Sequence, residues 1–189
     1  TAHLAALAAI ELTAVDSDRQ RARRIDDNLA RLGLHAGARV QVVVDDVVAA
    51  ARAGRLPAAS FDRILLDAPC TASGIVRRHP DIPWLRRPAD VVNLATQQAR
   101  MLDALWSLLA PAGRLLYAVC SVFADEAALQ IDRFVDRTGG ARRLPLAGRA
   151  ADALPGPALQ LIPCERDDDA GGLPGVHDGF FYALLEKER

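Results

Sequence analysis

The 189-residue chain has little cysteine, no long apolar run and no excess of charge. Its three cysteines, Cys70, Cys120 and Cys164, are an odd number, which argues against a disulfide framework and favours a reducing cytoplasm. No apolar run reaches the roughly 18 residues of a membrane span and no leader-like segment opens the chain, so we expect a soluble protein without a membrane partner. A net charge of −1 argues against a generally basic nucleic-acid binder but permits a local basic face.

Motifs for metals and dinucleotides are also absent from the sequence. No CxxC, HExxH or cluster of histidines is present, so we expect no metal site. No G-x-G-x-x-G turn follows a strand-like run, which argues against a nicotinamide oxidoreductase. With 51% hydrophobic residues, the chain is long enough for one domain with a full core, so we expect residues 1–189 to form one domain.

What the sequence does contain is an alternation of strand-like and helix-like segments. The run 12–18 predicts a strand leading into a helix that is capped by Ser17 and Gln20 and ends at Gly33. Later helices are expected over about 91–109 and about 124–137, the second with Leu129 and Ile131 facing inward. The expected further strands are 39–46, 61–69, 113–121 and a late pair, 158–163 and 179–185. The pattern predicts an α/β fold: a mostly parallel sheet with helices on both faces and a terminal antiparallel strand pair.

Polar residues follow the expected strands, where ligands bind in such sheets. Asp16 follows the first strand and is either a ligand for the two ribose hydroxyls of a nucleotide-like cofactor or a helix cap. One of Asp45 and Asp46 either meets an adenine or belongs to a surface loop. Asp67 follows the third strand. These acids and the nearby cysteines indicate a site at one edge of the sheet.

Two of the three cysteines stand in loops of small residues. A cysteine that ends a strand is more often a small buried hydrophobe than a nucleophile, and Cys164, next to Pro163, fits that interpretation. Cys70 lies in PCTASG and Cys120 in CSVFADE, where the backbone can approach a ligand closely. We therefore expect these two thiols to be functional.

The irregular segment 75–87, which lies close to Cys70 in the sequence, holds four arginines, a histidine and Trp84. Arginine suits phosphate contacts, and Trp84 either stacks on a base or pins the segment to the core. The segment predicts an RNA contact made by Arg77, Arg78, His79, Trp84, Arg86 and Arg87.

The two cysteine segments carry a family resemblance. DAPCTASG (67–74) resembles the DAPCS-x-[ST]-G loop of the RNA 5-methylcytosine methyltransferases, and YAVCSVFADE (117–126) resembles their Y-[AS]-T-C-S-x-x-x-x-E segment. RRHPDIPWLRR (77–87) is similar to the bacterial RsmB type, also called Sun or Fmu, which modifies a cytosine of 16S ribosomal RNA, and DGFFYALL (178–185) is similar to its closing strand. The resemblance implies a Rossmann-like class I methyltransferase fold, S-adenosylmethionine as cofactor and 16S ribosomal RNA as partner.

The chemistry of that family explains a pair of thiols. Because C5 of cytosine is too electron-poor to attack a methyl donor, a thiolate first adds to C6, and a second thiol assists its later release. By resemblance Cys120 attacks and Cys70 releases, whereas DNA cytosine methyltransferases attack from the Pro-Cys loop, and the residues alone leave the assignment open. The resemblance further implies that Asp67 hydrogen-bonds the base near N3 and that Pro69 shapes the loop. For the cofactor, the resemblance implies that Asp16 binds the ribose and Asp45 the adenine. It also places Asp67 and Pro69 next to the bound cofactor.

The resemblance also has a gap at the start of the chain. The family's first strand and glycine loop, D-x-C-A-A-P-G-G-K-T, and its upstream RNA-binding domain precede the part that matches, and only Thr1 stands before AHLAALAA. We therefore expect residues 1–189 alone to be a weak or inactive methyltransferase of low stability. The alternative is a catalytically silent RNA-binding remnant of such an enzyme.

Overall fold

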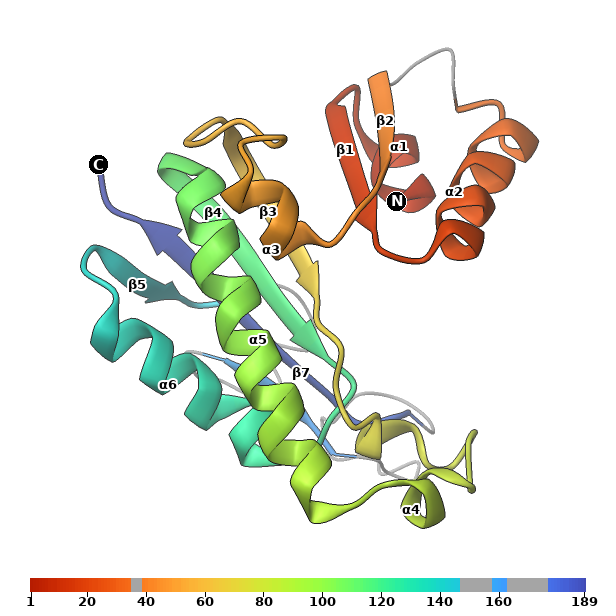
Figure 1. Cartoon of the computed structure of the whole chain (residues 1–189), viewed down its shortest axis with the longest axis vertical. Coiled ribbons are helices and arrows are strands. Elements are labelled where there is room, and N and C mark those ends of the chain that lie inside the picture. Colours follow the sequence, from red (N-terminus) through yellow and green to blue (C-terminus); the bar gives the residue numbers. More distant parts are fainter. Residues whose placement is uncertain (35–38, 147–157, 163–176) are drawn as a thin grey trace, which may run out of the picture. The chain divides into compact units, whose positions relative to one another are not determined.

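The computed structural model describes residues 1–34, 39–146, 158–162 and 177–189 (Figure 1). They form two compact units, Thr1–Leu56 and Pro57–Arg189, each built around its own sheet. Cys164 and the end of the expected strand 158–163 lie outside the described residues.

The described residues of the first unit form a pair of parallel strands and three α-helices. Strands β1 (Glu11–Asp16) and β2 (Arg39–Val44) pair in register from Glu11 opposite Arg39 to Asp16 opposite Val44. The helices are α1 (Ala2–Leu7), α2 (Arg19–Arg31) and α3 (Val47–Arg52). Its core forms around the fully buried Leu29, which packs with Ala5, Ile25, Leu34 and Val40. The strand–helix–strand order therefore matches the expected α/β pattern.

The start of α2 differs from the capping box expected at Ser17. Asp18 is the N-cap residue, and its Oδ1 accepts hydrogen bonds from the N–H groups of Gln20 and Arg21 at 2.7 and 3.0 Å. Ser17 is too early for this role because the helix begins only at Arg19, which leaves Asp18 next to the free N–H groups. Gly33 follows the helix with φ of +66°, as expected for a glycine that ends a helix.

The second unit contains a mixed sheet with strand order β3–β4–β7–β5, and β6 pairs with β7. Its strands are β3 (Phe61–Asp67), β4 (Leu109–Val119), β5 (Ala141–Leu144), β6 (Leu159–Leu161) and β7 (Phe180–Lys187). β3 and β4 are parallel, whereas β7 is antiparallel to β4, β5 and β6. The expected antiparallel pairing of the two late strands is confirmed, and β7 also runs between β4 and β5.

The long helix α5 (Pro88–Leu108) and the short helix α6 (Ala128–Arg137) pack together against this sheet (Figure 1). The rings of Trp106 and Phe134 meet edge to face at 5.3 Å, and the Lys187 ammonium donates to the carbonyls of Trp106 and Leu109 at 2.9 Å each. The Lys187 ammonium thus satisfies backbone carbonyls around the end of α5 that have no intrahelical partner. This contact stabilises the transition from α5 to β4.

The inward face of α6 was predicted only in part. Ile131 and Phe134 are fully buried, but Leu129 is 41% exposed, so its expected inward position is wrong. Two residues of an α-helix span about 200°, which puts Leu129 on the face opposite Ile131. The helix itself begins at Ala128, after a 3₁₀ turn, η3 (Ala124–Glu126). No helix among the described residues is both long and apolar enough to cross a membrane.

Candidate active site

The two cysteine loops, residues 69–74 with Cys70 and residues 120–126 with Cys120, follow neighbouring parallel strands of the sheet. β3 ends at Asp67 and β4 ends at Val119, and in the pairing of these strands Asp67 lies opposite Ala118. The Ala68 N–H still donates to the Ala118 carbonyl at 3.0 Å. Cys70 and Cys120 therefore follow adjacent strands at the same, carboxyl, edge of the sheet, where ligands bind in such folds.

The structure brings the two thiols into direct contact. The Sγ atoms of Cys70 and Cys120 are 3.4 Å apart, and both residues are half-buried. The hydrogen bond to Cys70 lowers the pKa of Cys120 to about 7, against the opposing effects of burial and of the charges of Asp67 and Glu126. The same hydrogen bond, together with burial, raises the pKa of Cys70. Cys120 thus favours the thiolate while Cys70 stays protonated and donates to it.

The difference between the two thiol pKa values bears on which cysteine attacks and which assists release, an assignment that the sequence left open. Only a thiolate is an effective nucleophile, so the sulfur that is more easily deprotonated is the better candidate for attack. A thiol that keeps its proton near neutral pH is suited to proton transfer or to assisting release. The 3.4 Å contact is symmetric between the two sulfurs, and only the lowered pKa of Cys120 points to that residue as the thiolate.

Alkylation of Cys120 by iodoacetamide is expected to rise through a midpoint near neutral pH and to depend on Cys70. In Cys70→Ala the thiolate loses its hydrogen-bond donor, so the midpoint should move upward toward the ordinary cysteine value of about 8.5. The measurement is the rate of Cys120 modification against pH by mass spectrometry, with Cys164→Ser in all samples to remove the third thiol. An unchanged midpoint in Cys70→Ala would show that Cys70 does not tune Cys120.

A buried carboxylate at the end of the second cysteine loop contacts the residues that follow both cysteines. Glu126 has no exposed surface and accepts hydrogen bonds from Thr71, next to Cys70, and from Ser121, next to Cys120. Its importance was not predicted, although it is the acid at the end of the second cysteine motif. A charged residue in a loop normally points to solvent, so the sequence offered only this motif position as a signal.

Further contacts hold the loop that follows β3. The Gln98 amide donates to the Pro69 carbonyl at 2.9 Å, and Arg86 Nε donates to the Thr71 carbonyl at the same distance. The Gly74 N–H donates to the Cys120 carbonyl at 3.0 Å, which joins the first loop directly to the second. Pro69 thus lies in a loop that is held by a side chain of α5. Arg86 connects this loop to residues 75–87, the arginine segment.

Asp67 and Tyr182 add two titratable groups to the same edge. Partial burial of the carboxyl raises the pKa of Asp67, although the residue as a whole is exposed. Burial, followed by the charges of Asp67 and Cys120, also raises the pKa of Tyr182 on β7. A carboxyl that retains a proton more readily can share it with a ring nitrogen of a base. Tyr182 was not predicted, since in the sequence it is only one aromatic residue of an apolar strand.

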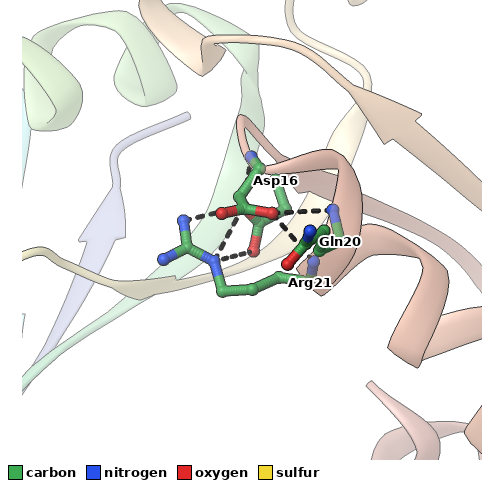
Figure 2. Close-up of polar contacts among 4 residues, drawn as sticks. Asp16, Gln20 and Arg21 are labelled. Atoms are coloured by element: carbon green, nitrogen blue, oxygen red, sulfur yellow. Dashed lines mark hydrogen bonds and ion pairs between the residues drawn. The ribbon is translucent and has the colours of Figure 1, made fainter.

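In the first unit, the two expected cofactor acids each pair with an arginine. Figure 2 shows Asp16 facing Arg21, whose Nη2 and Nε lie 2.9 Å from Oδ1 and 3.0 Å from Oδ2. This hydrogen bond lowers the pKa of Asp16, so the carboxylate is held ionised. Asp45 pairs with Arg55 at 2.7 Å, and its pKa is lowered for the same reason.

The structure also shows that Asp16 is not the cap residue of α2, the alternative role that the sequence left open for it. The cap of α2 is Asp18, and the cap of α3 is Asp46, whose carboxylate accepts from the Ala49 N–H at 2.8 Å. The Asp45 N–H donates to the Asp16 carbonyl at 3.1 Å, so Asp16 and Asp45 lie at adjacent strand ends. The two acids therefore stand side by side at one edge of the two-stranded sheet, each paired with an arginine.

The arginine segment is exposed and partly paired. Trp84 is 89% exposed, so the interpretation that it pins the segment to the core is wrong. Asp178, at 8% exposure, forms ion pairs with Arg77 at 3.6 Å and with Arg78 at 2.5 Å. His79, Arg86 and Arg87 are also exposed. Among the described residues, no group of three or more His, Cys, Asp or Glu side chains could hold a metal ion.

Comparisons with known proteins identify the family of this chain and agree with its fold. A model of the family described as 16S rRNA methyltransferase RsmB/F matches residues 1–186. The chain is 46% identical over 184 residues to ribosomal RNA small subunit methyltransferase B of Salmonella dublin, a match that covers 94% of this chain and 37% of that relative.

Two solved structures extend the comparison to the fold. PH0851 has a TM-score of 0.78 at 29% identity, over 94% of this chain and 37% of that one. A methyltransferase homolog protein from Pyrococcus horikoshii has a TM-score of 0.68 at 30% identity, over 94% of this chain and 53% of that one. The fold is therefore the Rossmann-like fold of the class I S-adenosylmethionine-dependent methyltransferases.

The family follows from the match over residues 1–186. The chain belongs to the 16S rRNA methyltransferase RsmB/F family. It spans 37% of the length of the curated Salmonella dublin relative.

Proposed function

We propose that this chain carries the catalytic thiols of an enzyme that transfers a methyl group from S-adenosylmethionine to C5 of a cytosine in 16S ribosomal RNA. The observation that carries the proposal is the contact between Cys70 and Cys120, 3.4 Å apart, with the pKa of Cys120 lowered to about 7. A lone nucleophile needs no second thiol within reach, whereas a second thiol in contact with the first suits attack and assisted release on one base. Membership of the RsmB/F family supports the same activity.

In the proposed mechanism, the Cys120 thiolate adds to C6 of the cytosine and forms a carbon–sulfur bond. Asp67 hydrogen-bonds the base at N3, and the raised pKa of its carboxyl suits a shared proton there while negative charge develops on the ring. After C5 has been methylated, the C5–H bond breaks and its proton passes to a solvent water molecule, while the C5–C6 double bond re-forms and the carbon–sulfur bond breaks. Cys70 assists this release by giving its proton to the departing Cys120 sulfur, since the two sulfurs are already in contact.

Asp16 and Asp45 fit an adenosyl group at the edge of the first unit. When bound, S-adenosylmethionine would supply the electrophilic methyl group. Asp16 Oδ2 accepts only from Arg21 among the described contacts, which leaves it capacity to accept from a ribose hydroxyl. Asp45 lies at the next strand end and would border the adenine. Arg21 keeps Asp16 ionised, and an ionised carboxylate makes the stronger hydrogen bonds to hydroxyl groups.

The arginine segment would hold the RNA beside the thiols. Trp84 offers an almost fully exposed ring on which an unpaired base can stack. Arg77, Arg78, His79, Arg86 and Arg87 lie in the same exposed segment, and their cations suit phosphate contacts. The Arg86 contact to the Thr71 carbonyl ties RNA binding to the loop that carries Cys70.

The proposal is tested by a tritiated-methyl assay with the full protein and 16S ribosomal RNA, followed by mapping of 5-methylcytosine. Asp16→Ala should weaken cofactor binding about 100-fold in calorimetric titration, because hydrogen bonds from ribose hydroxyls to a charged group are lost. Asp27→Ala, at an exposed acid of α2, is the matched control and should bind normally. RNA binding without any methyl incorporation would instead support the alternative, a silent RNA-binding protein.

A further inference from the structure

Glu126 satisfies four hydrogen-bond donors with one fully buried carboxylate. Oε1 accepts from the Thr71 N–H at 2.9 Å and from the Gln98 amide at 3.2 Å. Oε2 accepts from the Thr71 hydroxyl at 2.6 Å and from the Ser121 hydroxyl at 2.7 Å. A buried carboxylate is costly unless its lone pairs are filled, and here about four lone-pair sites meet four donors.

Three of the four donors come from the residues that follow the two cysteines. Thr71 is the residue after Cys70, and Ser121 is the residue after Cys120. Both are fully buried, as is Gln98 of α5, which also holds the Pro69 carbonyl. Each sulfur is therefore one residue away from an anchor on the same carboxylate.

We propose that Glu126 is a positioning residue that clasps the two cysteine loops, so that both thiols meet one bound cytosine. This inference rests on the proposed function for its purpose, but the clasp itself is a property of the folded chain. Because the anchors directly adjoin the cysteines, loss of the carboxylate frees the two loops from each other and widens the separation of the sulfurs.

The contribution of Glu126 is geometric and not electrostatic activation. Its negative charge raises the pKa of both thiols, which opposes formation of the thiolate. A glutamine at this position can keep all four contacts, since its carbonyl can accept from the Thr71 N–H and from Gln98. Its amide can donate to the hydroxyls of Thr71 and Ser121, which accept as well as donate. Geometry and charge can therefore be separated by experiment.

The test measures how quickly Cys70 and Cys120 form a disulfide in the full protein with Cys164→Ser. Oxidised glutathione is attacked by the Cys120 thiolate, which releases one reduced glutathione and leaves a mixed disulfide. Cys70, once deprotonated, then attacks the Cys120 sulfur of that mixed disulfide and releases a second glutathione. The rate of the second step reports the separation of the two sulfurs and needs no RNA and no cofactor.

E126Q should close the disulfide at close to the wild-type rate, whereas E126A should close it about 100-fold more slowly, as expected when reacting groups are misplaced by about 1 Å. D125A is the matched control, because Asp125 is the neighbouring acid and pairs only with the surface Arg133 in the described contacts. In methyl transfer, E126A should lose kcat with little change in KM for RNA, and E126Q should restore kcat.

A folded E126A that closes the disulfide at the wild-type rate overturns the clasp, as does an E126Q that is as slow as E126A. Where circular dichroism shows E126A unfolded, Thr71→Val and Ser121→Ala take its place, since each removes one hydroxyl anchor. Wild-type rates in both of these variants overturn the proposal, and slower closure in either supports it. The expected disulfide pattern without methyl transfer by the wild type would refute the proposed function and leave the clasp supported.

Discussion

Cys120→Ala is expected to abolish methyl transfer and to leave no covalent protein–RNA adduct, whereas Cys70→Ala is expected to accumulate one. Without Cys120 no sulfur with a lowered pKa remains to add to C6. Without Cys70 the attack still occurs, but the sulfur in contact with Cys120 is no longer present to assist elimination. The loss of methyl transfer in Cys120→Ala should be at least about 1,000-fold, as is usual when a covalent nucleophile is removed.

Denaturing gels of the full protein with 16S ribosomal RNA and S-adenosylmethionine measure the adduct directly. In Cys70→Ala the adduct should form faster as the pH rises above neutral, because the pKa of Cys120 is expected to rise in that variant. Cys164→Ala serves as the control and should methylate RNA without a trapped adduct. An adduct in Cys120→Ala and none in Cys70→Ala would exchange the two roles.

Gly74→Ala is expected to destabilise the second unit strongly, although it adds only one methyl group. An added Cβ would lie 2.1 Å from the Gly179 carbonyl oxygen, so one of two backbone segments must move. That movement would break the hydrogen bonds that Gly74 makes with Cys120 and Gly179. A loss of about 3 kcal/mol in the free energy of unfolding is the magnitude typical of such overpacking.

Urea denaturation of the wild type, Gly74→Ala and Gly139→Ala measures this effect. Gly139 is exposed and its added Cβ would have no atom within 4 Å, so its substitution should change stability little. Faster alkylation of the two thiols in Gly74→Ala would accompany the loss, because the loops would open. Equal stabilities for Gly74→Ala and the wild type would mean that the close approach to Gly179 is easily relaxed.

The sequence predicted those parts of the site that depend on strand ends and local motifs. Cys70 and Cys120 follow apolar runs that end in small residues, and adjacent parallel strands then bring them together. Asp16 and Asp45 were placed correctly at strand ends for the same reason. These predictions needed only the order of the strands and the rule that ligands meet their carboxyl ends.

Features that depend on contacts between distant segments were not predictable in this way. The arginine partners of Asp16 and Asp45, the pairing of Arg78 with Asp178 and the burial of Glu126 all depend on the folded arrangement. The difference between the two thiol pKa values arises from their 3.4 Å contact, which no single loop specifies. Leu129 was misplaced because hydrophobicity alone does not give the face of a short helix that meets the sheet.

β7 follows both cysteine loops in the sequence, so during translation it can join the sheet only after these loops have been made. β7 (Phe180–Lys187) is the partner of β4, β5 and β6, and the residues just before it, Asp178 and Gly179, contact the arginine segment and Gly74. A nascent chain in which both cysteine loops have already left the ribosome therefore still lacks the strand that pairs with β4 beside them. Long-range pairing of this kind is slow to form, so newly made chains pass through a period in which reactive thiols and unpaired strand edges are exposed to chaperones and oxidants.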